Sequence, residues 1–251
     1  MTRIMTYNVH RCVGTDGRLD VGRVAEVIAR QRPDIVALQE VDVGRARTRH
    51  VDQAHELAHR LDMAFHFNAA LTIEEERYGD AILTRLPERR VKSAPLPGHP
   101  GHRAFRALEP RGALWLAISI GGQELQVINT HLGLVPAEQA AQAAALAGHD
   151  WLGHPDCKAP TVLVGDLNAV LGSRALRRLL ARLQDARALA RPGGASGLLA
   201  TFPSRMPLAP IDHILVSPGV VVRGLSVPRD RLTALASDHA PLVMDFDLPP
   251  A

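Results

Sequence analysis

Five short segments of the sequence place Asn, Asp, Glu or His directly after an apolar run. They read YNVH at residues 7–10, LQEVD at 38–42, NTHL at 129–132, GDLN at 165–168 and SDH at 237–239. A side chain at the end of a buried strand is held by a rigid backbone and faces the rim of the sheet. Each segment alone is also compatible with a structural role, such as a turn or a hydrogen-bonded core histidine. Five segments of compatible chemistry in one chain indicate a shared site.

The chemistry of these side chains points to a hard metal ion and a phosphate. Carboxylate and amide oxygens suit Mg²⁺ or Mn²⁺, and the sequence has no cluster of cysteines that could build a zinc site. Histidines beside such carboxylates supply an acid–base group and a positive charge for a phosphoryl group in transfer. The sequence contains no G-x-S-x-G or P-loop motif, which argues against serine hydrolases and P-loop NTPases. We therefore expect metal-assisted hydrolysis of a phosphoric ester.

The first part of the chain alternates strand and helix patterns that would position these segments. Residues 4–9 and 34–39 have the apolar pattern of buried strands. Between them, Asp20 can cap a helix that ends at Pro33. A second amphipathic helix is expected around residues 54–61, where apolar residues recur one turn apart.

From about residue 64 the pattern changes to short extended runs. Gly121-Gly122 predicts a hairpin, Pro136 begins a helix that reaches about Ala147, and Ser173 can cap another. Residues 188–208 predict a long surface loop because they are rich in Gly, Pro and Ser. The expected strands are 64–67, 80–83, 91–96, 113–120, 125–129, 161–164, 211–216, 220–227 and 240–246. This excess of strands over helices predicts two packed sheets covered by helices.

The composition limits the class of protein. The 251 residues are 46% hydrophobic and 22% charged, as in a globular rather than a disordered chain. The net charge of +3 is too small to identify a nucleic acid or an anionic membrane as the partner. Cys12 and Cys157 match no redox or metal spacing, and no signal peptide or bilayer-spanning apolar stretch is found. We expect a cytoplasmic protein without a transmembrane segment, and no obligate protein partner is evident.

Six motifs, in this order, resemble those of the endonuclease/exonuclease/phosphatase superfamily of metal-dependent hydrolases. The motifs are TYNVH, LQEVD, NTHLGL, GDLNA, IDHILVS and SDHAPL, and the resemblance extends from about residue 3 to 246. It implies an α/β fold, a four-layered sandwich in which two central mixed β-sheets pack face to face and are flanked by helices. It also implies a single domain over residues 1–251, with the site at the rim between the sheets.

The resemblance implies a divalent metal site at the first and last motifs. Glu40 matches the principal metal-binding glutamate of the superfamily, and Asn8 matches the asparagine that helps to build that site. Asp238 matches the metal-side aspartate of the SDH motif. The implied cofactor is Mg²⁺ or Mn²⁺.

The resemblance also implies the catalytic groups. His239 matches the histidine at the scissile phosphate, and Asp212 matches the carboxylate that orients it. Asp166 matches the aspartate that acts on the nucleophilic water or a second metal, and Asn168 the asparagine that holds a phosphate oxygen. His131 matches a phosphate-stabilising or acid residue.

Three further residues are weaker candidates for the substrate phosphate. Arg47 lies in an arginine-rich run, residues 44–49, that follows the LQEVD motif. Glu76 resembles a glutamate that orients the histidine of the NTHLGL motif, and Arg111 resembles a phosphate-facing arginine.

The sequence leaves the substrate class open. A phosphodiester of a lipid or a small head group is the first hypothesis. A DNA or RNA nuclease is the second, using the arginines of residues 44–49 and 174–182. A binding module that has kept the fold without turnover is the third. Because aromatic residues are only 4% of the chain, we expect that long duplex DNA is not the best substrate.

Overall fold

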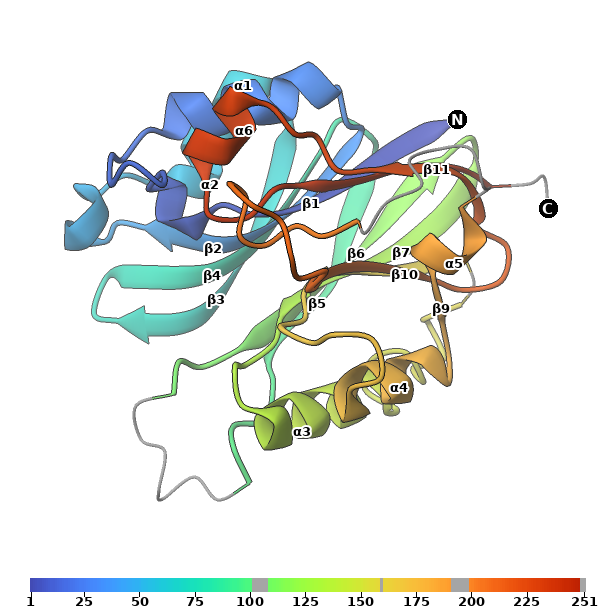
Figure 1. The fold of residues 1–251 in the computed structure, drawn as a ribbon. Coiled ribbons are helices and arrows are strands. Elements are labelled where there is room, and N and C mark those ends of the chain that lie inside the picture. Colours follow the sequence, from blue (N-terminus) through green and yellow to red (C-terminus); the bar gives the residue numbers. More distant parts are fainter. Residues whose placement is uncertain (101–107, 159, 191–198, 249–251) are drawn as a thin grey trace.

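Two six-stranded β-sheets lie face to face, and helices cover the outer face of each (Figure 1). The computed structural model describes residues 1–100, 108–158, 160–190 and 199–248. Three apolar layers result, one between the sheets and one between each sheet and its helices. This arrangement confirms the expected four-layered α/β sandwich.

The first sheet has the strand order β11-β12-β1-β2-β4-β3. Its strands are β1 (Thr2–Asn8), β2 (Ile35–Val43), β3 (Ala64–Ile73), β4 (Glu76–Thr84), β11 (Val221–Ser226) and β12 (Leu242–Asp247). β1 and β2 are parallel and all other neighbours are antiparallel, so the sheet is mixed. Both ends of the chain enter this sheet, because β1 pairs with β12.

The second sheet has the strand order β5-β6-β7-β8-β10-β9. Its strands are β5 (Glu88–Pro95), β6 (Gly112–Ile120), β7 (Gln123–His131), β8 (Thr161–Asp166), β9 (Gln184–Asp185) and β10 (Asp212–Val216). Here β7 and β8 form the parallel pair. Each sheet therefore has one parallel pair at its centre, and the site motifs lie at the carboxyl ends of these four strands or close to them.

Helices pack on the outer faces. The first sheet is covered by α1 (Val21–Gln31), α2 (Gln53–Leu61) and α6 (Arg231–Ala236), and the second by α3 (Pro136–Ala147) and α4 (Arg174–Leu180). The short helices η1 (His10–Cys12), η2 (Ala46–Thr48) and α5 (Ala186–Leu189) lie in connections. None of the helices in the described parts of the chain is long and apolar enough to cross a membrane.

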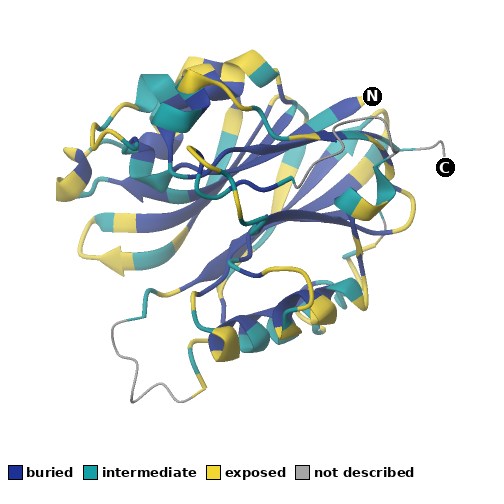
Figure 2. Cartoon of the chain, viewed as in Figure 1, coloured by how far each residue is buried: buried dark blue, intermediate teal, exposed yellow. Residues whose placement is uncertain are grey.

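Along the central strands, successive side chains point alternately into two different apolar layers. In β2, Ile35 points between the sheets and Val36 faces α1 and α2. In β6, Leu114 points between the sheets and Trp115 faces the side of α3 and α4. Successive strand side chains point to opposite faces, so strands buried on both faces are continuous apolar runs in the sequence. Figure 2 shows this burial along the centre of both sheets.

Several local expectations are confirmed by the backbone. The Asp20 carboxylate accepts a hydrogen bond from the backbone N–H of Arg23 and caps α1. Ser173 caps α4 in the same way, and Pro136 is the first residue of α3. Gly121 and Gly122 have φ angles of 58° and 87° in the β6–β7 hairpin, a conformation that favours glycine.

Other elements differ from the expectation. β3 and β4 form a hairpin much longer than 64–67 and 80–83 predict, because the outer part of β3 is half-exposed and carries no continuous apolar signal. α6 was not expected, since its six residues are too few for a clear helical period. Of the predicted loop, residues 191–198 lie outside the described residues, and α5 includes residues 188 and 189.

Candidate active site

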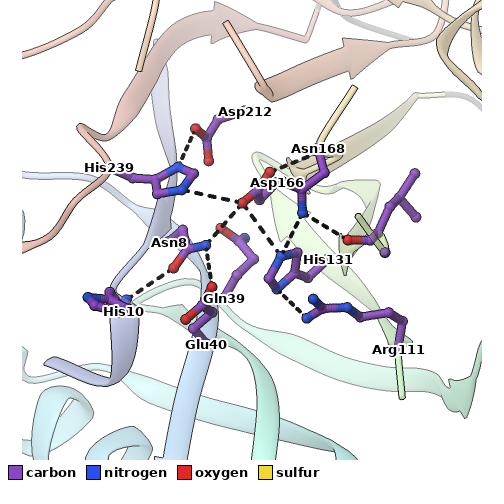
Figure 3. Close-up of polar contacts among 12 residues, drawn as sticks. Asn8, His10, Gln39, Glu40, Arg111, His131, Asp166, Asn168, Asp212 and His239 are labelled. Atoms are coloured by element: carbon purple, nitrogen blue, oxygen red, sulfur yellow. Dashed lines mark hydrogen bonds and ion pairs between the residues drawn. The ribbon is translucent and has the colours of Figure 1, made fainter. Parts of the chain in front are cut away.

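Strands of both sheets bring the predicted residues to one edge (Figure 3). Asn8 ends β1, Glu40 lies near the end of β2, His131 ends β7 and Asp166 ends β8. Asp212 begins the antiparallel β10 directly opposite Asp166, so the start of β10 reaches the same edge. The cleft at this edge has a volume of about 410 Å³. The tertiary structure therefore brings together residues as distant in the sequence as Asn8 and His239.

Asp212 and His239 form a buried hydrogen-bonded pair. The Nδ1 atom of His239 lies 2.8 Å from Oδ2 of Asp212, and the Thr201 hydroxyl donates to the same oxygen. Burial acts to lower the pKa of His239, but the Asp212 carboxylate, with smaller contributions from other aspartates, raises it to about 10. The ring is therefore an imidazolium at neutral pH. Its Nε2 atom faces Oδ2 of Asp166 at 3.6 Å.

Asp166 is the centre of the site and is 1% exposed. Its Oδ2 accepts a hydrogen bond of 3.0 Å from the Asn8 amide, and its Oδ1 accepts one of 2.9 Å from the backbone N–H of Asn168. Burial and the nearby Asp212 carboxylate raise the pKa of Asp166 above its usual value, against the opposing effect of His239. A carboxylate of raised pKa is a stronger proton acceptor.

His131, in contrast to His239, is held in the neutral state. Nη1 of Arg111 donates to Nδ1 of His131 over 2.8 Å. Burial, Arg111 and His239 together hold the pKa of His131 well below its usual range. Because a guanidinium can only donate, the proton of the neutral ring is on Nε2. That atom faces Oδ2 of Asp166, its acceptor, at 3.5 Å. The Asn168 amide nitrogen is also near Nε2, at 3.1 Å, but it donates to the backbone carbonyl of Leu132.

Asn8 joins the two sheets at the site. Its Oδ1 accepts the backbone N–H of His10, which fixes the orientation of the amide. Its Nδ2 atom then donates to Oε1 of Glu40 over 3.1 Å and to Oδ2 of Asp166 over 3.0 Å. Asn8 thus presents its nitrogen, rather than its oxygen, to the two carboxylates and positions them.

Glu40 is placed by an irregularity of β2. The pairing with β4 shifts register between Leu38 and Val41, and Glu40 has a φ of 58° in this bulge. A bulge re-aims the side chain that it contains. Among the described residues, Asn8 is the only hydrogen-bond partner of the Glu40 carboxylate, and no basic nitrogen lies within ion-pair distance of it.

This donor set fits a hard divalent cation. Glu40 and Asp238 both line the cleft, and the Asp238 side chain is 37% exposed. Within the described part of the chain, its one ionic partner is the His10 ring, 3.8 Å away. Asp166, Asp212 and His239 also place ligand atoms within 4.8 Å of one another. His239, however, uses Nδ1 on Asp212, so these three residues are better suited to proton transfer. Oxygen ligands without a cationic partner are the ones that favour Mg²⁺ or Mn²⁺.

Two weaker candidates lie in other surroundings. The guanidinium of Arg47 borders the cleft, but it donates twice to the buried Asp42 and covers the ring of Tyr78. The resemblance implied that Glu76 lies beside His131, but its contacts are with other residues. Its carboxylate accepts the backbone N–H of Ala46 and pairs with Arg45. The third candidate, Arg111, lines the cleft and contacts His131 directly.

Sequence reasoning missed a buried amide pair that joins the sheets beneath the site. Nε2 of Gln39 donates to Oδ1 of Asn129 over 2.7 Å, and both side chains are fully buried. The Asn129 amide in turn donates to the backbone carbonyls of Leu38 and Ala81 in the first sheet. Both residues stand in the quoted motifs as the first polar residue after an apolar run, and that pattern was the available signal.

A second missed group supports the far side of the site. Nε2 of His213 lies 2.7 Å from the carbonyl of Ala169, and Arg187 donates to the backbone carbonyl of Asp212. Asp185 pairs with both His213 and Arg187. These contacts fix the loop after Asn168 and the first residue of β10. His213 follows Asp212 in the IDHILVS motif, whereas nothing in the sequence marks Arg187.

Comparison with known proteins adds to this geometry. The sequence model of the Endonuclease/Exonuclease/phosphatase family matches residues 5–239. No protein of curated function matches the sequence. Among solved structures, an endonuclease/exonuclease/phosphatase from Beutenbergia cavernae is similar, with a TM-score of 0.76, 24% identity, and coverage of 98% of this chain and 71% of that chain.

Two further similar structures carry names of their own. The mannosyl-6-phosphatase Bt3783 of Bacteroides thetaiotaomicron has a TM-score of 0.77 and 19% identity over 98% of this chain and 100% of that chain. The human Nocturnin catalytic domain with bound sulfate has a TM-score of 0.69 and 22% identity over 98% of this chain and 93% of that chain. At these identities the likeness shows the fold.

Proposed function

Because the chain belongs to the Endonuclease/Exonuclease/phosphatase family and is a hydrolase of phosphoric ester bonds, we propose that it hydrolyses phosphodiesters with Mg²⁺, or Mn²⁺, held at Glu40. The observation that carries the proposal is the arrangement around Asp166. The Nε2 atoms of His131 and His239 both face one oxygen of the buried Asp166 carboxylate. The Asn8 amide donates to that same oxygen and to Glu40, whose carboxylate has no basic partner among the described residues.

Glu40 and Asp238 are the residues that would hold the metal, with Asn8 as the group that positions Glu40. A bound divalent ion neutralises charge on a phosphate oxygen and on the leaving oxygen. The all-oxygen donor set and the lack of a basic partner at Glu40 support this assignment. Because no side chain becomes covalently attached to phosphorus, the proposal needs no nucleophilic Ser or Cys.

The remaining residues supply the acid–base chemistry. Asp166 accepts a proton from water, whose oxygen forms the new bond to phosphorus while the bond to the leaving oxygen breaks. The imidazolium of His239 and the neutral Nε2–H of His131 both point to the Asp166 oxygen. A phosphoryl group beside that oxygen would therefore meet two ring N–H donors as its negative charge develops.

A small phosphodiester, of a lipid or a head group, is the substrate class that we favour. The arginine-rich run of residues 44–49 offers less to a nucleic acid than its sequence suggests, since Arg45 pairs with Glu76 and Arg47 with Asp42. No Phe, Tyr or Trp side chain in the described ranges is exposed, so these residues offer no stacking platform for bases there. A nuclease remains the alternative against which this choice is tested.

The test is hydrolysis of two soluble chromogenic esters after treatment with chelator. We expect bis-p-nitrophenyl phosphate to be hydrolysed faster than the monoester p-nitrophenyl phosphate, with activity restored by Mg²⁺ or Mn²⁺. The monoester is the relevant comparator because a similar structure is a phosphatase. Undiminished activity in chelator would refute the metal, and preference for the monoester would refute the diester.

Two further attributes of the chain are part of the proposal. We place the protein in the cytoplasm, which is supported by Cys12 and Cys157 being free thiols. We also assign residues 1–251 to one domain, which is supported by the pairing of β1 with β12 in the same sheet.

A further inference from the structure

Large apolar side chains are exposed on three loops beside the cleft. They are Leu134, Val170, Leu171, Met206 and Leu208, with exposed fractions from 52% to 68%. We call these five residues the apolar rim. Among the described residues, the other large apolar side chains that are exposed are Met1, Ile73 and Val221. Most of the exposed large apolar side chains thus lie in loops that begin or end at the site.

Each of the three loops is anchored at a residue of the cleft. Leu134 lines the cleft itself, three residues after His131. Val170 and Leu171 follow Asn168, another lining residue, and Figure 2 shows an exposed stretch in this loop before α4. The third loop leaves the cleft at Phe202 and returns to it at Ile211.

The turn that carries Met206 and Leu208 is itself well held. Backbone hydrogen bonds join Phe202 to Leu208 and Ala209. The backbone N–H of Ser204 donates to the carbonyl of Asp238, beside the catalytic histidine. The exposure of the two apolar side chains is therefore set by a closed turn. Apolar side chains that gather around a functional cleft and face solvent mark an interaction surface.

Unpaired positive charge lies next to one of these loops. Arg174, Arg177 and Arg178 are exposed on α4, which begins three residues after Leu171. They have no ionic partner among the described residues. Some exposed arginines elsewhere are paired, for example Arg60 with Glu56 and Arg89 with Glu124, whereas others, such as Arg32 and Arg90, have no ion pair within the described part of the chain. On α4 three unpaired arginines lie within five residues of one another. These three residues, the α4 arginines, are free to bind an anionic partner.

We propose that the apolar rim and the α4 arginines dock the protein on the surface of an anionic lipid bilayer. The aliphatic side chains enter the interfacial region, and the α4 arginines contact anionic head groups. The cleft then opens toward the head-group layer, where the phosphodiester of a lipid lies. The choice of a lipid as substrate rests on the proposed function, whereas docking itself does not require turnover.

A nucleic acid fits this surface less well. Single strands are bound by aromatic side chains that stack on bases, and no Phe, Tyr or Trp side chain in the described ranges is exposed. Leu, Val and Met side chains gain free energy by leaving water for a lipid interface, which a phosphate backbone does not offer. The combination of aliphatic and unpaired basic groups is that of a peripheral membrane surface.

The experiment measures sedimentation of the full chain with vesicles in the presence of chelator, so that no turnover occurs. One set of vesicles is phosphatidylcholine, and the other contains equal parts of phosphatidylcholine and phosphatidylglycerol. We expect binding to the anionic vesicles that weakens at high salt and weaker binding to the neutral ones. Replacing all three α4 arginines by Gln should remove most of the preference for anionic vesicles.

The variant that tests the rim combines Val170→Ser, Leu171→Ser, Met206→Ser and Leu208→Ser. We expect it to need at least about tenfold more lipid for half-maximal binding, since it loses most of the apolar area of the rim. The matched control is Ile73→Ser with Val221→Ser, which removes exposed apolar side chains from other elements and should bind as the parent does. Circular dichroism and thermal unfolding confirm that both variants are folded.

Three results would overturn the docking proposal. The parent could fail to sediment with anionic vesicles, or the rim variant could bind them as the parent does. The parent could also bind a single-stranded oligonucleotide in preference to vesicles and lose that binding in the rim variant, which would assign the surface to nucleic acid. Hydrolysis of the soluble diester by the parent is measured separately. Vesicle binding without hydrolysis would refute the proposed function alone, and hydrolysis without vesicle binding would refute docking alone.

Discussion

The two sheets bring side chains of opposite electrostatic states to the same cleft. On the second sheet, Asp166 and Asp212 are buried, and each already has N–H donors or a charged histidine as partners. On the first sheet, Glu40 is only half-buried and has the Asn8 amide as its partner. One side of the cleft is thus internally balanced, whereas the other leaves negative charge that an external cation can neutralise.

The two histidines of the cleft also differ in charge, although they contact the same carboxylate. Both Nε2 atoms face Oδ2 of Asp166, at 3.5 Å for His131 and 3.6 Å for His239. Burial, together with Arg111 beside the first ring, keeps that ring neutral, whereas Asp212 beside the second ring keeps it charged in spite of its burial. Since both rings are buried, the charge of the partner on the far side of each ring accounts for the difference between them.

The largest effect on turnover is expected from removing a residue of the Asp212–His239 pair, on the side of the cleft where the charges are balanced. Asp212→Asn should leave the fold intact and lower kcat by about 10⁴-fold, as loss of the carboxylate does in other Asp–His pairs. His239→Gln should cost a similar factor. The double variant should cost little more than the worse single variant, because the two residues act as a unit. The readout is kcat on bis-p-nitrophenyl phosphate with saturating Mg²⁺. Multiplied losses in the double variant would show that the residues act independently.

The next effect tests the side that requires a cation. Glu40→Gln should raise the Mg²⁺ concentration for half-maximal activity by about 100-fold or more, since an amide is a much weaker ligand for a hard cation. Calorimetric titration with Mg²⁺ gives a readout that is independent of turnover. The matched control is Glu76→Gln, whose carboxylate lies on Arg45 away from the cleft. Equal metal affinity in the parent and the Glu40 variant would contradict the assignment.

A smaller effect is expected from making the histidines alike. Arg111→Met removes the cation beside His131, so the pKa of His131 should rise from its lowered value. The ring then becomes protonated at a higher pH than in the parent. NMR titration of the histidine ring protons between pH 5 and 8 measures this directly, and we expect a loss of about tenfold in kcat/KM. An unchanged titration would show that burial alone keeps the ring neutral.

The smallest effect concerns the third group on Asp212. Thr201→Val removes the hydroxyl that donates to Oδ2 of Asp212. We expect kcat to fall by about fivefold, which corresponds to a hydrogen bond of about 1 kcal/mol. Thr201→Ser keeps the donor and should behave as the parent does. A loss in the Val variant as large as that of Asp212→Asn would mean that the hydroxyl, and not the carboxylate, orients His239.

The local structure around the site could be predicted because its signals are contiguous in the chain. Asp20 and Ser173 mark helix starts through hydrogen bonds from backbone N–H groups within one turn of them, and Pro136 marks one through its fixed φ angle and missing N–H. Gly121-Gly122 marks a hairpin through backbone freedom alone. The full length of the β3–β4 hairpin was missed because β3 is an edge strand whose outer part is largely exposed and therefore carries little apolar pattern.

The sequence by itself determined which chemical groups are available at the strand ends and, through its motifs, the layered fold that collects them. Only the tertiary structure decided how each group behaves. The bulge that aims Glu40, the pairing of Glu76 with Arg45, and the neutral and charged states of His131 and His239 all depend on partners distant in sequence. The physical reason is that burial and charge act through space, so ionisation and orientation are fixed only when both sheets are in place.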